Sequence, residues 1–254
     1  MSVPKTPSFR LDGRRALVTG GGRGIGLACA AAFAEAGAEV VLTARGSEEI
    51  ENAAAEIQAA GGKAEAVVLD VTDLAATRDF IAARGPFRVL VNNAGSSRHA
   101  HFLDLTEEDY NAVADLNIKA ALFAAREVAN GLIKAGLPGS IINISSQMGH
   151  VGGPERSVYC ATKHAVEGFT KAMAWELGQH DIRINTICPT FILTRMTQAS
   201  FDDPEKRAWI ESKIALGRVG RIEDIMGAAL YLASDASAMV TGSALMVDGG
   251  WTAA

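Results

Sequence analysis

The feature that most constrains this chain is a regular alternation of short apolar runs and longer alanine-rich segments. The apolar runs lie at residues 15–19, 39–43, 65–69, 87–91, 140–144, 182–188 and 243–247. Most of the segments between them have helical periodicity, and they lie at residues 24–36, 47–60, 73–83, 106–134, 157–178 and 221–234. Strands that are apolar along nearly their whole length are typical of parallel sheets covered on both faces. The alternation therefore predicts an α/β fold, with a doubly wound parallel sheet of about seven strands and helices on both faces.

The same pattern indicates a single domain over residues 1–254, because no repeat or low-complexity linker divides it. Residues 190–220 interrupt the alternation. They lack an apolar strand and contain Asp202-Asp203-Pro204. A segment of this kind predicts short helices that form a substrate lid over a site.

Bulk properties exclude several classes of protein. A net charge of −5 gives no support for binding nucleic acid or an anionic membrane. The three cysteines, Cys29, Cys160 and Cys188, form no Cys-x-x-Cys pair, which fits a reducing compartment. The N-terminal residues lack the apolar core of a signal peptide, and no run is long enough to span a bilayer. We therefore expect a cytoplasmic protein.

A glycine-rich turn follows the first apolar run. Residues 15–19 lead into Gly20-Gly-Gly-Arg23-Gly24-Ile25-Gly26 and then into an alanine-rich helical segment. Glycines let the backbone approach a pyrophosphate closely, and the helix N-terminus offers unpaired N–H groups. The spacing differs from the Gly-x-Gly-x-x-Gly fingerprint, and no Lys-Ser or Lys-Thr follows as in a P-loop. The segment predicts a dinucleotide site, with an ordinary glycine-rich turn as the alternative.

A second chemical signal is Tyr159 with Lys163, four positions later in a predicted helix, and Ser146 upstream. Residues four apart lie on one helix face, so the phenol and the ammonium can meet. A nearby ammonium favours the phenolate and predicts a lowered pKa for Tyr159. Tyr159 would then serve as a general acid and base near neutral pH, while the Ser146 hydroxyl holds a carbonyl or alcohol oxygen.

Together these segments resemble the short-chain dehydrogenase/reductase family, in its compact single-domain branch. The resemblance covers the chain from about residue 8 to its end, in the family's order and spacing. It implies a Rossmann-like fold and an oxidoreductase that interconverts a carbonyl and a secondary alcohol. The matching segments are Thr19-Gly20-x-x-x-Gly24-x-Gly26, Asp70, Asn92-Asn-Ala-Gly95, Asn117, Ile144-Ser-Ser146, Tyr159-x-x-x-Lys163, Pro189 to Thr194 and Val247-Asp-Gly-Gly250.

The resemblance also assigns roles. Tyr159 exchanges a proton with the reacting oxygen, Lys163 holds the nicotinamide ribose and tunes Tyr159, and Ser146 binds the oxygen. Asn117 corresponds to the residue that holds a proton-relay water, with a satisfied buried polar group as the alternative. The residues implied in cofactor binding are Gly20, Arg23, Gly24, Ile25, Gly26, Arg45, Asp70, Val71, Asn93, Ala94, Gly95, Tyr159, Lys163, Pro189, Ile192 and Thr194.

The end of the second apolar run indicates which cofactor is used. An acidic residue there binds the adenosine ribose 2′-hydroxyl of NAD(H), whereas arginine accommodates the 2′-phosphate of NADP(H). This chain has Ala44 followed by Arg45, and Arg23 in the glycine turn adds a second cation. The sequence therefore favours NADP(H), with NAD(H) as the alternative. Arg23 and Arg45 as solvated side chains without a ligand are the competing interpretation.

The substrate is less well defined by the sequence. The candidate lining residues Gln147, His150, Arg156 and Phe191 are largely polar, which predicts a sugar, a polyol or a small hydroxy or keto acid. A 3-oxoacyl-carrier-protein or 3-oxoacyl-CoA reductase and a non-catalytic dinucleotide-binding regulator are the alternatives.

Three further expectations concern the site and the assembly. The pair His99-x-His101 lacks further metal ligands, so no metal is expected. Thr190 stands where the family usually has glycine, and its β-carbon puts the fit of nicotinamide and substrate in question. The resemblance also implies a homotetramer.

Overall fold

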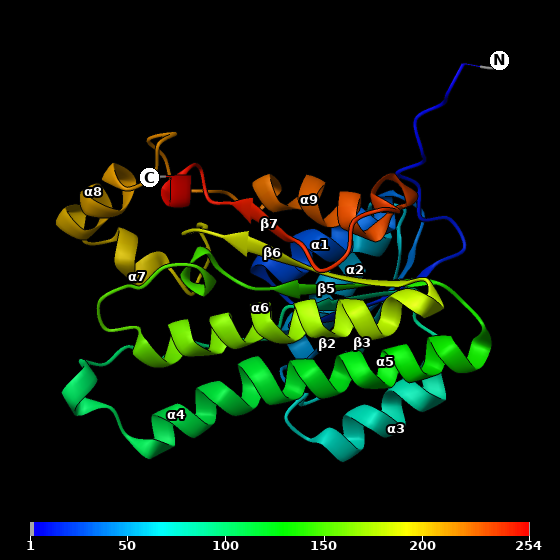
Figure 1. The fold of residues 1–254 in the computed structure, drawn as a ribbon, viewed down its shortest axis with the longest axis horizontal. Coiled ribbons are helices and arrows are strands. Elements are labelled where there is room, and N and C mark those ends of the chain that lie inside the picture. The colour runs from blue at the N-terminus through cyan, green and yellow to red at the C-terminus, as the bar shows by residue number, and fades with distance from the viewer. Residues whose placement is uncertain (1–2, 254) are drawn as a thin grey trace.

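The computed structural model describes residues 3–253, and its centre is one seven-stranded parallel sheet (Figure 1). The strand order is β3-β2-β1-β4-β5-β6-β7, and every neighbouring pair is parallel. The predicted doubly wound sheet is therefore confirmed. The strands are β1 (Arg15–Thr19), β2 (Glu39–Ala44), β3 (Lys63–Val68), β4 (Val89–Asn92), β5 (Gly139–Ile144), β6 (Ile182–Pro189) and β7 (Ala244–Val247).

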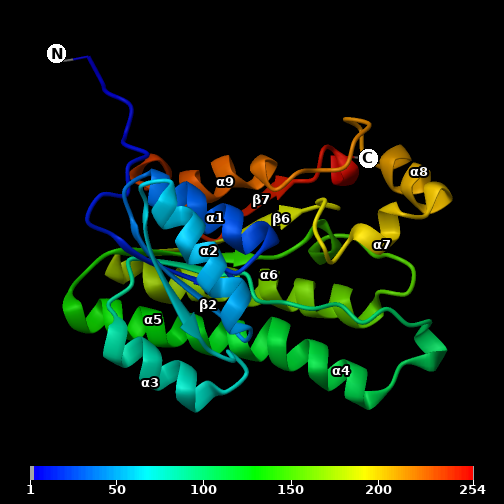
Figure 2. The same cartoon turned by 180° about the vertical axis from the view of Figure 1, so that it is seen from behind.

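Helices cover both faces of this sheet (Figures 1 and 2). One face carries α1 (Gly24–Glu35), α2 (Ser47–Ala59) and α9 (Glu223–Ala233). The other carries α3 (Leu74–Arg84), α5 (Ala121–Ala135) and α6 (Ser157–Leu177). Side chains along each strand therefore alternate between two apolar cores: Ala16 and Val18 of β1 face one, and Leu17 faces the other.

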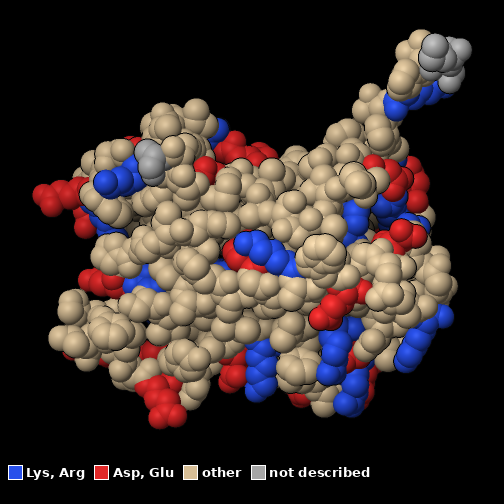
Figure 3. Space-filling view, viewed as in Figure 1, with Lys and Arg blue, Asp and Glu red and all other residues tan. Residues whose placement is uncertain are grey.

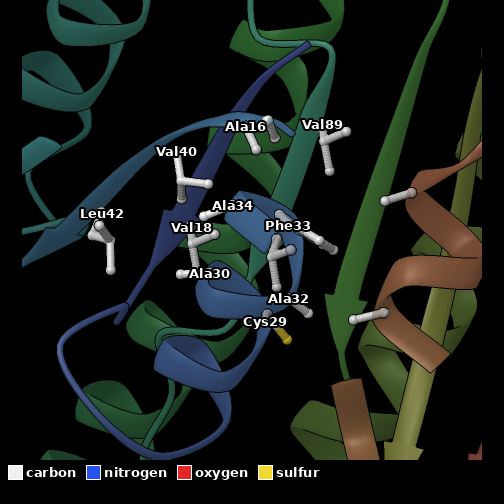
Figure 4. Close-up of a cluster of buried hydrophobic side chains, with 14 of the residues drawn as sticks. Ala16, Val18, Cys29, Ala30, Ala32, Phe33, Ala34, Val40, Leu42 and Val89 are labelled. Atoms are coloured by element: carbon white, nitrogen blue, oxygen red, sulfur yellow. The ribbon is translucent and has the colours of Figure 1, made fainter. Parts of the chain in front are cut away.

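Small residues let α1 pack closely on the sheet. Cys29, Ala30 and Phe33 of α1 are fully buried against β1, β2 and β4 (Figure 4). The alanines keep the helix near the strands, and the Phe33 ring fills the remaining space. This packing fixes the helix whose N-terminus lies beside the glycine turn.

The strand order places a crevice at the carboxyl edge of the sheet. Along the chain, β1, β2 and β3 run toward one side, and β4 then returns to pair with β1. The connections that follow β1 and β4 therefore leave on opposite faces, and this reversal is where open α/β sheets bind ligands. Thr19 ends β1 and Asn92 ends β4 at this point.

The predicted helix over 106–134 is interrupted. α4 (Glu107–Ala114) continues into a π-helical segment, Asp115–Ala120, before α5 begins. The Thr106 hydroxyl caps α4 by accepting from the Asp109 N–H, at 3.1 Å. The Asp109 carboxylate accepts from the Thr106 hydroxyl and from Arg98, both at 2.8 Å. Isolated π turns are frequent at functional sites, and this one contains Asn117.

Residues 190–220 form two short helices, α7 (Gln198–Phe201) and α8 (Pro204–Ser212), as the broken pattern predicts. They have an apolar cluster of their own, made of Phe191, Phe201, Ile210 and Ile214, with Val219 and Trp251 packed against it. One isolated bridge, Ile192 to Gly220, closes the base of the segment. The segment is thus a separately packed lobe at the carboxyl edge of β6.

Charged side chains of both signs are scattered over the face in Figure 3, with one group of both signs near its centre. Within residues 3–253, no helix is long and apolar enough to cross a membrane.

Replacing Phe33 with alanine tests the packing of α1. Because Phe33 is fully buried, Phe33→Ala is expected to lower the free energy of unfolding by about 3–5 kcal/mol. Phe102→Ala removes a ring that is 67% exposed, and a change below about 0.5 kcal/mol is expected. Urea unfolding followed by circular dichroism measures both. Equal losses in the two variants would contradict the assigned core.

Candidate active site

The glycine turn joins β1 to α1 through a very close backbone approach. Gly20 and Gly24 have φ values of +63° and +55°, in the left-handed region that favours glycine. A β-carbon on Gly26 would lie 2.3 Å from the Gly20 carbonyl oxygen and 2.5 Å from Nδ2 of Asn93. No other residue type fits at Gly26 without moving the backbone. The turn is therefore built for close approach, as a pyrophosphate site requires.

The N-terminus of α1 is open to an anion. The residue before it, Arg23, provides no side-chain cap, and the first turn contains no acidic residue. Its first N–H groups and the positive end of the helix dipole thus have no anionic partner within the helix. A β-carbon on Gly24 would lie 3.4 Å from Cγ2 of Thr194, so the lobe at 190–220 reaches this turn. These features fit a dinucleotide pyrophosphate.

Asn93 braces the same turn from β4. Its Nδ2 donates to the carbonyl oxygens of Thr19 and Gly20, at 3.0 and 2.9 Å. The Thr19 hydroxyl in turn accepts from the N–H groups of Asn93 and Ala94, both at 3.1 Å. These four bonds join the ends of β1 and β4, and so fix the crevice.

The other end of the predicted cofactor site lies at β2. Arg45 is exposed and close enough to Asp70 to lower the pKa of that carboxyl, although bonds from Thr72 are the larger cause. Arg23 lies 3.0 Å from Glu49 of α2, in an ion pair. No carboxylate of residues 3–253 lies within 4.0 Å of the Arg45 guanidinium. Arg45 is therefore better placed than Arg23 to receive a 2′-phosphate.

Tyr159, Lys163 and Ser146 meet at the carboxyl ends of β5 and β6. The Lys163 ammonium lies 5.6 Å from the centroid of the Tyr159 ring and donates to the Ile144 carbonyl oxygen, at 2.8 Å. The Ser146 hydroxyl acts on the phenol to lower its pKa. It also donates to Oε1 of Gln147, at 2.7 Å. The structure thus brings together three groups from two segments, α6 and the end of β5.

The prediction of a lowered pKa for Tyr159 is wrong for this structure. Burial raises the pKa of the phenol, and the Ser146 hydroxyl opposes only part of that shift. Burial likewise lowers the pKa of Lys163 to about 8, partly offset by Cys188 and Glu167. Both groups resist charging because the protein around them replaces water, and the ammonium is directed to a backbone carbonyl. The cation that lowers the pKa of the phenol is Arg156 rather than Lys163, and burial outweighs its effect.

Asn117 is a fully engaged buried amide. Its Oδ1 accepts from the Ser96 N–H, and its Nδ2 donates to the Ser96 carbonyl oxygen, both at 2.9 Å. Nδ2 also donates to the Thr162 hydroxyl, at 3.1 Å. Both amide hydrogens are used, so the side chain ties the 95–96 loop to α6. Neither amide hydrogen is left for the proton-relay water that the resemblance implies.

The predicted substrate residues separate into two groups. Gln147 is buried against Ser146, and His150 is turned toward Cys188, with Nε2 3.5 Å from the sulfur. Arg156 and Phe191 instead contact each other, with the guanidinium carbon 5.3 Å from the ring centroid. This second pair joins the loop before α6 to the lobe at 190–220.

Thr190 has its hydroxyl buried with no hydrogen-bond partner within residues 3–253. Its N–H donates to the Val247 carbonyl oxygen, at 3.3 Å. It follows Pro189, whose carbonyl oxygen lies 3.5 Å from the Ser146 hydroxyl. An orphaned hydroxyl at this position fits a polar ligand group such as a carboxamide.

Glu167 is a buried residue of this region that the sequence analysis did not select. Its carboxylate accepts from the Thr186 hydroxyl at 3.0 Å and from the Cys188 thiol at 3.2 Å, and lies 3.6 Å from Nε2 of His150. Burial and this carboxylate raise the pKa of Cys188 to about 12. Tyr159, Lys163 and Glu167 are spaced four residues apart, and that periodicity was the available signal.

The parallel sheet, the glycine turn at its switch point and the Tyr159–Lys163–Ser146 cluster define a dinucleotide-dependent oxidoreductase. A family model described as enoyl-(acyl carrier protein) reductase matches residues 20–252. With the relatives described next, it shows that the chain belongs to the short-chain dehydrogenase/reductase family. The resemblance read from the sequence is thereby confirmed.

Named relatives match nearly the whole chain. D-erythrulose reductase of Gallus gallus is 42% identical over 245 residues, covering 96% of this chain and 98% of that protein. L-xylulose reductase of Bos taurus is 42% identical over 245 residues, covering 96% and 99%. A solved gluconate 5-dehydrogenase from Burkholderia cenocepacia J2315, in complex with NADP and tartrate, has a TM-score of 0.92 and 39% identity, covering 97% of this chain and 98% of that chain.

The buried ammonium predicts a pH-dependent stability difference. The pKa of Lys163 falls from 10.5 to about 8 on folding. Between these pH values the unfolded state binds more protons, so the contribution of this residue to stability rises with pH. Below pH 8 the buried ammonium is fully charged and lowers the free energy of unfolding by about 3 kcal/mol. A variant without the ammonium also loses its hydrogen bond to Ile144, which is worth about 1 kcal/mol.

Lys163→Met is therefore expected to raise the free energy of unfolding by about 2 kcal/mol at pH 7. The gain should shrink as the pH rises from 8 to 10.5, and urea titrations across that range measure it. Lys171→Met, which removes an exposed ammonium of the same helix, should show no such trend. A loss of stability in Lys163→Met at pH 7 would contradict the assigned desolvation.

Proposed function

We propose that this protein is an NADP(H)-dependent oxidoreductase that interconverts a ketone and a secondary alcohol on a small polar substrate. The observation that carries the proposal is the position of Tyr159, Ser146 and Lys163 at the carboxyl edge of the sheet. The glycine turn opens at the same edge. A cofactor bound along that edge therefore reaches the proton donor.

The residues fit each part of the dinucleotide. The Gly20–Gly26 turn and the N-terminus of α1 would hold the pyrophosphate, and Arg45 the 2′-phosphate. Lys163 would hold the nicotinamide ribose, and Thr190 with Thr194 would lie near the carboxamide. When bound, the nicotinamide supplies or accepts the hydride.

The chain supplies the proton chemistry. In reduction, Tyr159 gives its proton to the carbonyl oxygen, and in oxidation it takes the proton back. Ser146 holds that oxygen by a hydrogen bond. A raised pKa keeps the phenol protonated in the unliganded protein, so it is ready to act as the acid. Lys163 stabilises the phenolate that remains after transfer.

The substrate class follows from the lining and from the relatives. Three of the four predicted lining side chains, those of Gln147, His150 and Arg156, are polar or cationic. The named relatives are reductases or dehydrogenases of erythrulose, xylulose and gluconate. A small polyhydroxylated compound thus suits this site better than an acyl thioester. We also propose that the chain forms a single domain and that the lobe at residues 190–220 is its substrate lid.

The proposed assembly is a homotetramer in the cytoplasm. Trp175 of α6 is 89% exposed and Met239, before β7, is 98% exposed. The face that carries α6 has broad uncharged areas around one charged group near its centre (Figure 3). Large exposed apolar side chains on such a face are typical of an interface between copies. A single monomer peak in light scattering at micromolar concentration would refute the tetramer.

Removing one hydroxyl tests the catalytic assignment. Tyr159→Phe is expected to lower kcat for ketone reduction by about 100- to 10,000-fold, because it removes only the transferred proton. Binding of NADPH, measured by its fluorescence, should persist. Tyr110→Phe alters an exposed ring on α4 and should leave kcat unchanged. An active Tyr159→Phe enzyme would refute the role of this phenol.

Introducing an acid after β2 tests the cofactor. Ala44→Asp places a carboxylate beside Arg45, where it would repel the 2′-phosphate of NADPH. The dissociation constant for NADPH is therefore expected to rise at least about tenfold. Binding of NADH should weaken less or improve, since an acid there suits a ribose hydroxyl. Ala44→Asn has the same shape without the charge and serves as the control. Tighter NADH than NADPH binding in the unaltered protein would reject NADP(H).

A further inference from the structure

We propose that Arg156 binds the carboxylate of an acidic substrate, so that the enzyme acts on polyhydroxy or keto acids in preference to neutral sugars. This inference rests on the proposed function and specifies the substrate of the same site. It depends on where the guanidinium lies, on its missing counter-charge and on the other cations around it.

Arg156 lies at the mouth of the proposed active site. It immediately precedes α6 and stands three residues before Tyr159, and its charge acts on the phenol to lower its pKa. Its stem packs beside Gly153, where an added β-carbon would lie 3.3 Å from Cδ. The guanidinium lies over the Phe191 ring, at 5.3 Å. The cation is therefore held between the catalytic helix and the 190–220 lobe.

The backbone beside Arg156 is strained in a way that serves this placement. Glu155 has a φ of +58°, in the left-handed region where a residue other than glycine costs about 1–3 kcal/mol. The following residue begins the turn into α6. Such strain persists only where surrounding contacts enforce it, and it clusters at ligand sites.

The charge on Arg156 has no anionic partner in the protein. Within residues 3–253, no carboxylate lies within 4.0 Å of its guanidinium nitrogens, although the side chain is half-buried. Its one hydrogen bond is donated from Nη1 to Nε2 of His99, at 2.6 Å. Nearby Arg98, by contrast, pairs with Asp109 at 2.8 Å. Burial lowers the pKa of Arg156, so the site holds a partly desolvated cation.

The groups around the guanidinium are mostly cationic or neutral. Burial, Arg156 and Lys206 of α8 lower the pKa of His99, and Glu155 opposes this shift. A neutral His99 accepts the hydrogen bond from Arg156, which leaves the other guanidinium N–H groups free for a ligand. Two cations with one nearby carboxylate, that of Glu155, create a local excess of positive charge.

A carboxylate satisfies this arrangement best. The planar fork of arginine matches the two oxygens of a carboxylate, and a desolvated pair of this type is stronger than an exposed one. A neutral hydroxyl group would leave the charge uncompensated. A phosphate group could pair with the guanidinium in the same way, so the experiment must also distinguish a sugar phosphate from a sugar acid.

The test compares two ketones that differ only at the far end of the chain. L-sorbose carries a hydroxymethyl group where 5-keto-D-gluconate carries a carboxylate, and both present the same ketone. We expect NADPH oxidation with a kcat/KM at least about tenfold higher for 5-keto-D-gluconate. Arg156→Gln should lower that value by about 10- to 100-fold, mainly through KM, and should leave L-sorbose little changed.

Two further variants separate binding from a structural role. Arg156→Lys keeps the positive charge but lacks the planar guanidinium. Its KM for 5-keto-D-gluconate should lie between those of the unaltered enzyme and Arg156→Gln. Arg98→Gln removes a neighbouring arginine that is already paired, and should leave both substrates unchanged. Fructose 6-phosphate, tested beside fructose, reports whether phosphate replaces carboxylate.

Each outcome is decisive. Equal kcat/KM for 5-keto-D-gluconate and L-sorbose, or an equal loss for both in Arg156→Gln, would overturn the carboxylate assignment while the reductase function stands. A preference for fructose 6-phosphate over both 5-keto-D-gluconate and L-sorbose would show that Arg156 binds a phosphate group instead of a carboxylate. No NADPH oxidation with any of these compounds would instead count against the proposed function.

Discussion

The backbone approach between Gly20 and Gly26 is the constraint on which the rest of the site depends. It lets α1 begin within five residues of the end of β1, and so sets the helix against the sheet with its N-terminus at the crevice. The side-chain amide of Asn93 occupies the space that a β-carbon on Gly26 would need. The packing of α1 and the geometry of the proposed pyrophosphate site are therefore two consequences of the same contact.

The electrostatics of the site follow from burial more than from pairing. Lys163 is buried and Arg156 is half-buried, and burial lowers the pKa of each. Neither forms an ion pair within residues 3–253. A protein that keeps such cations gives up stability, and the cost is consistent with charges reserved for a ligand. In our proposals, Lys163 holds the nicotinamide ribose and stabilises the phenolate of Tyr159, and Arg156 binds the carboxylate of a substrate.

Local patterns made most of the fold predictable. The seven strands, the glycine turn and the Tyr159–Lys163 pair depend on residues close in sequence, and all appear in the structure. β3 begins at Lys63, two residues before the predicted run, because Lys63 and Ala64 pair with β2 although they are not strongly apolar. The π segment around Asn117 was not predicted, because tertiary bonds to Ser96 and Thr162 stabilise it.

The direction of a side chain was harder to predict than its presence. His150 and Arg156 both lie between Ser146 and Tyr159, and the sequence alone predicts the same substrate-lining role for both. In the structure, His150 turns toward Cys188 and Glu167, whereas Arg156 turns outward to Phe191. The difference arises because Glu167 offers His150 a buried carboxylate, while an aromatic face and a neutral histidine surround Arg156. A partner inside the protein thus makes His150 part of the scaffold, and the lack of one leaves Arg156 available to a substrate.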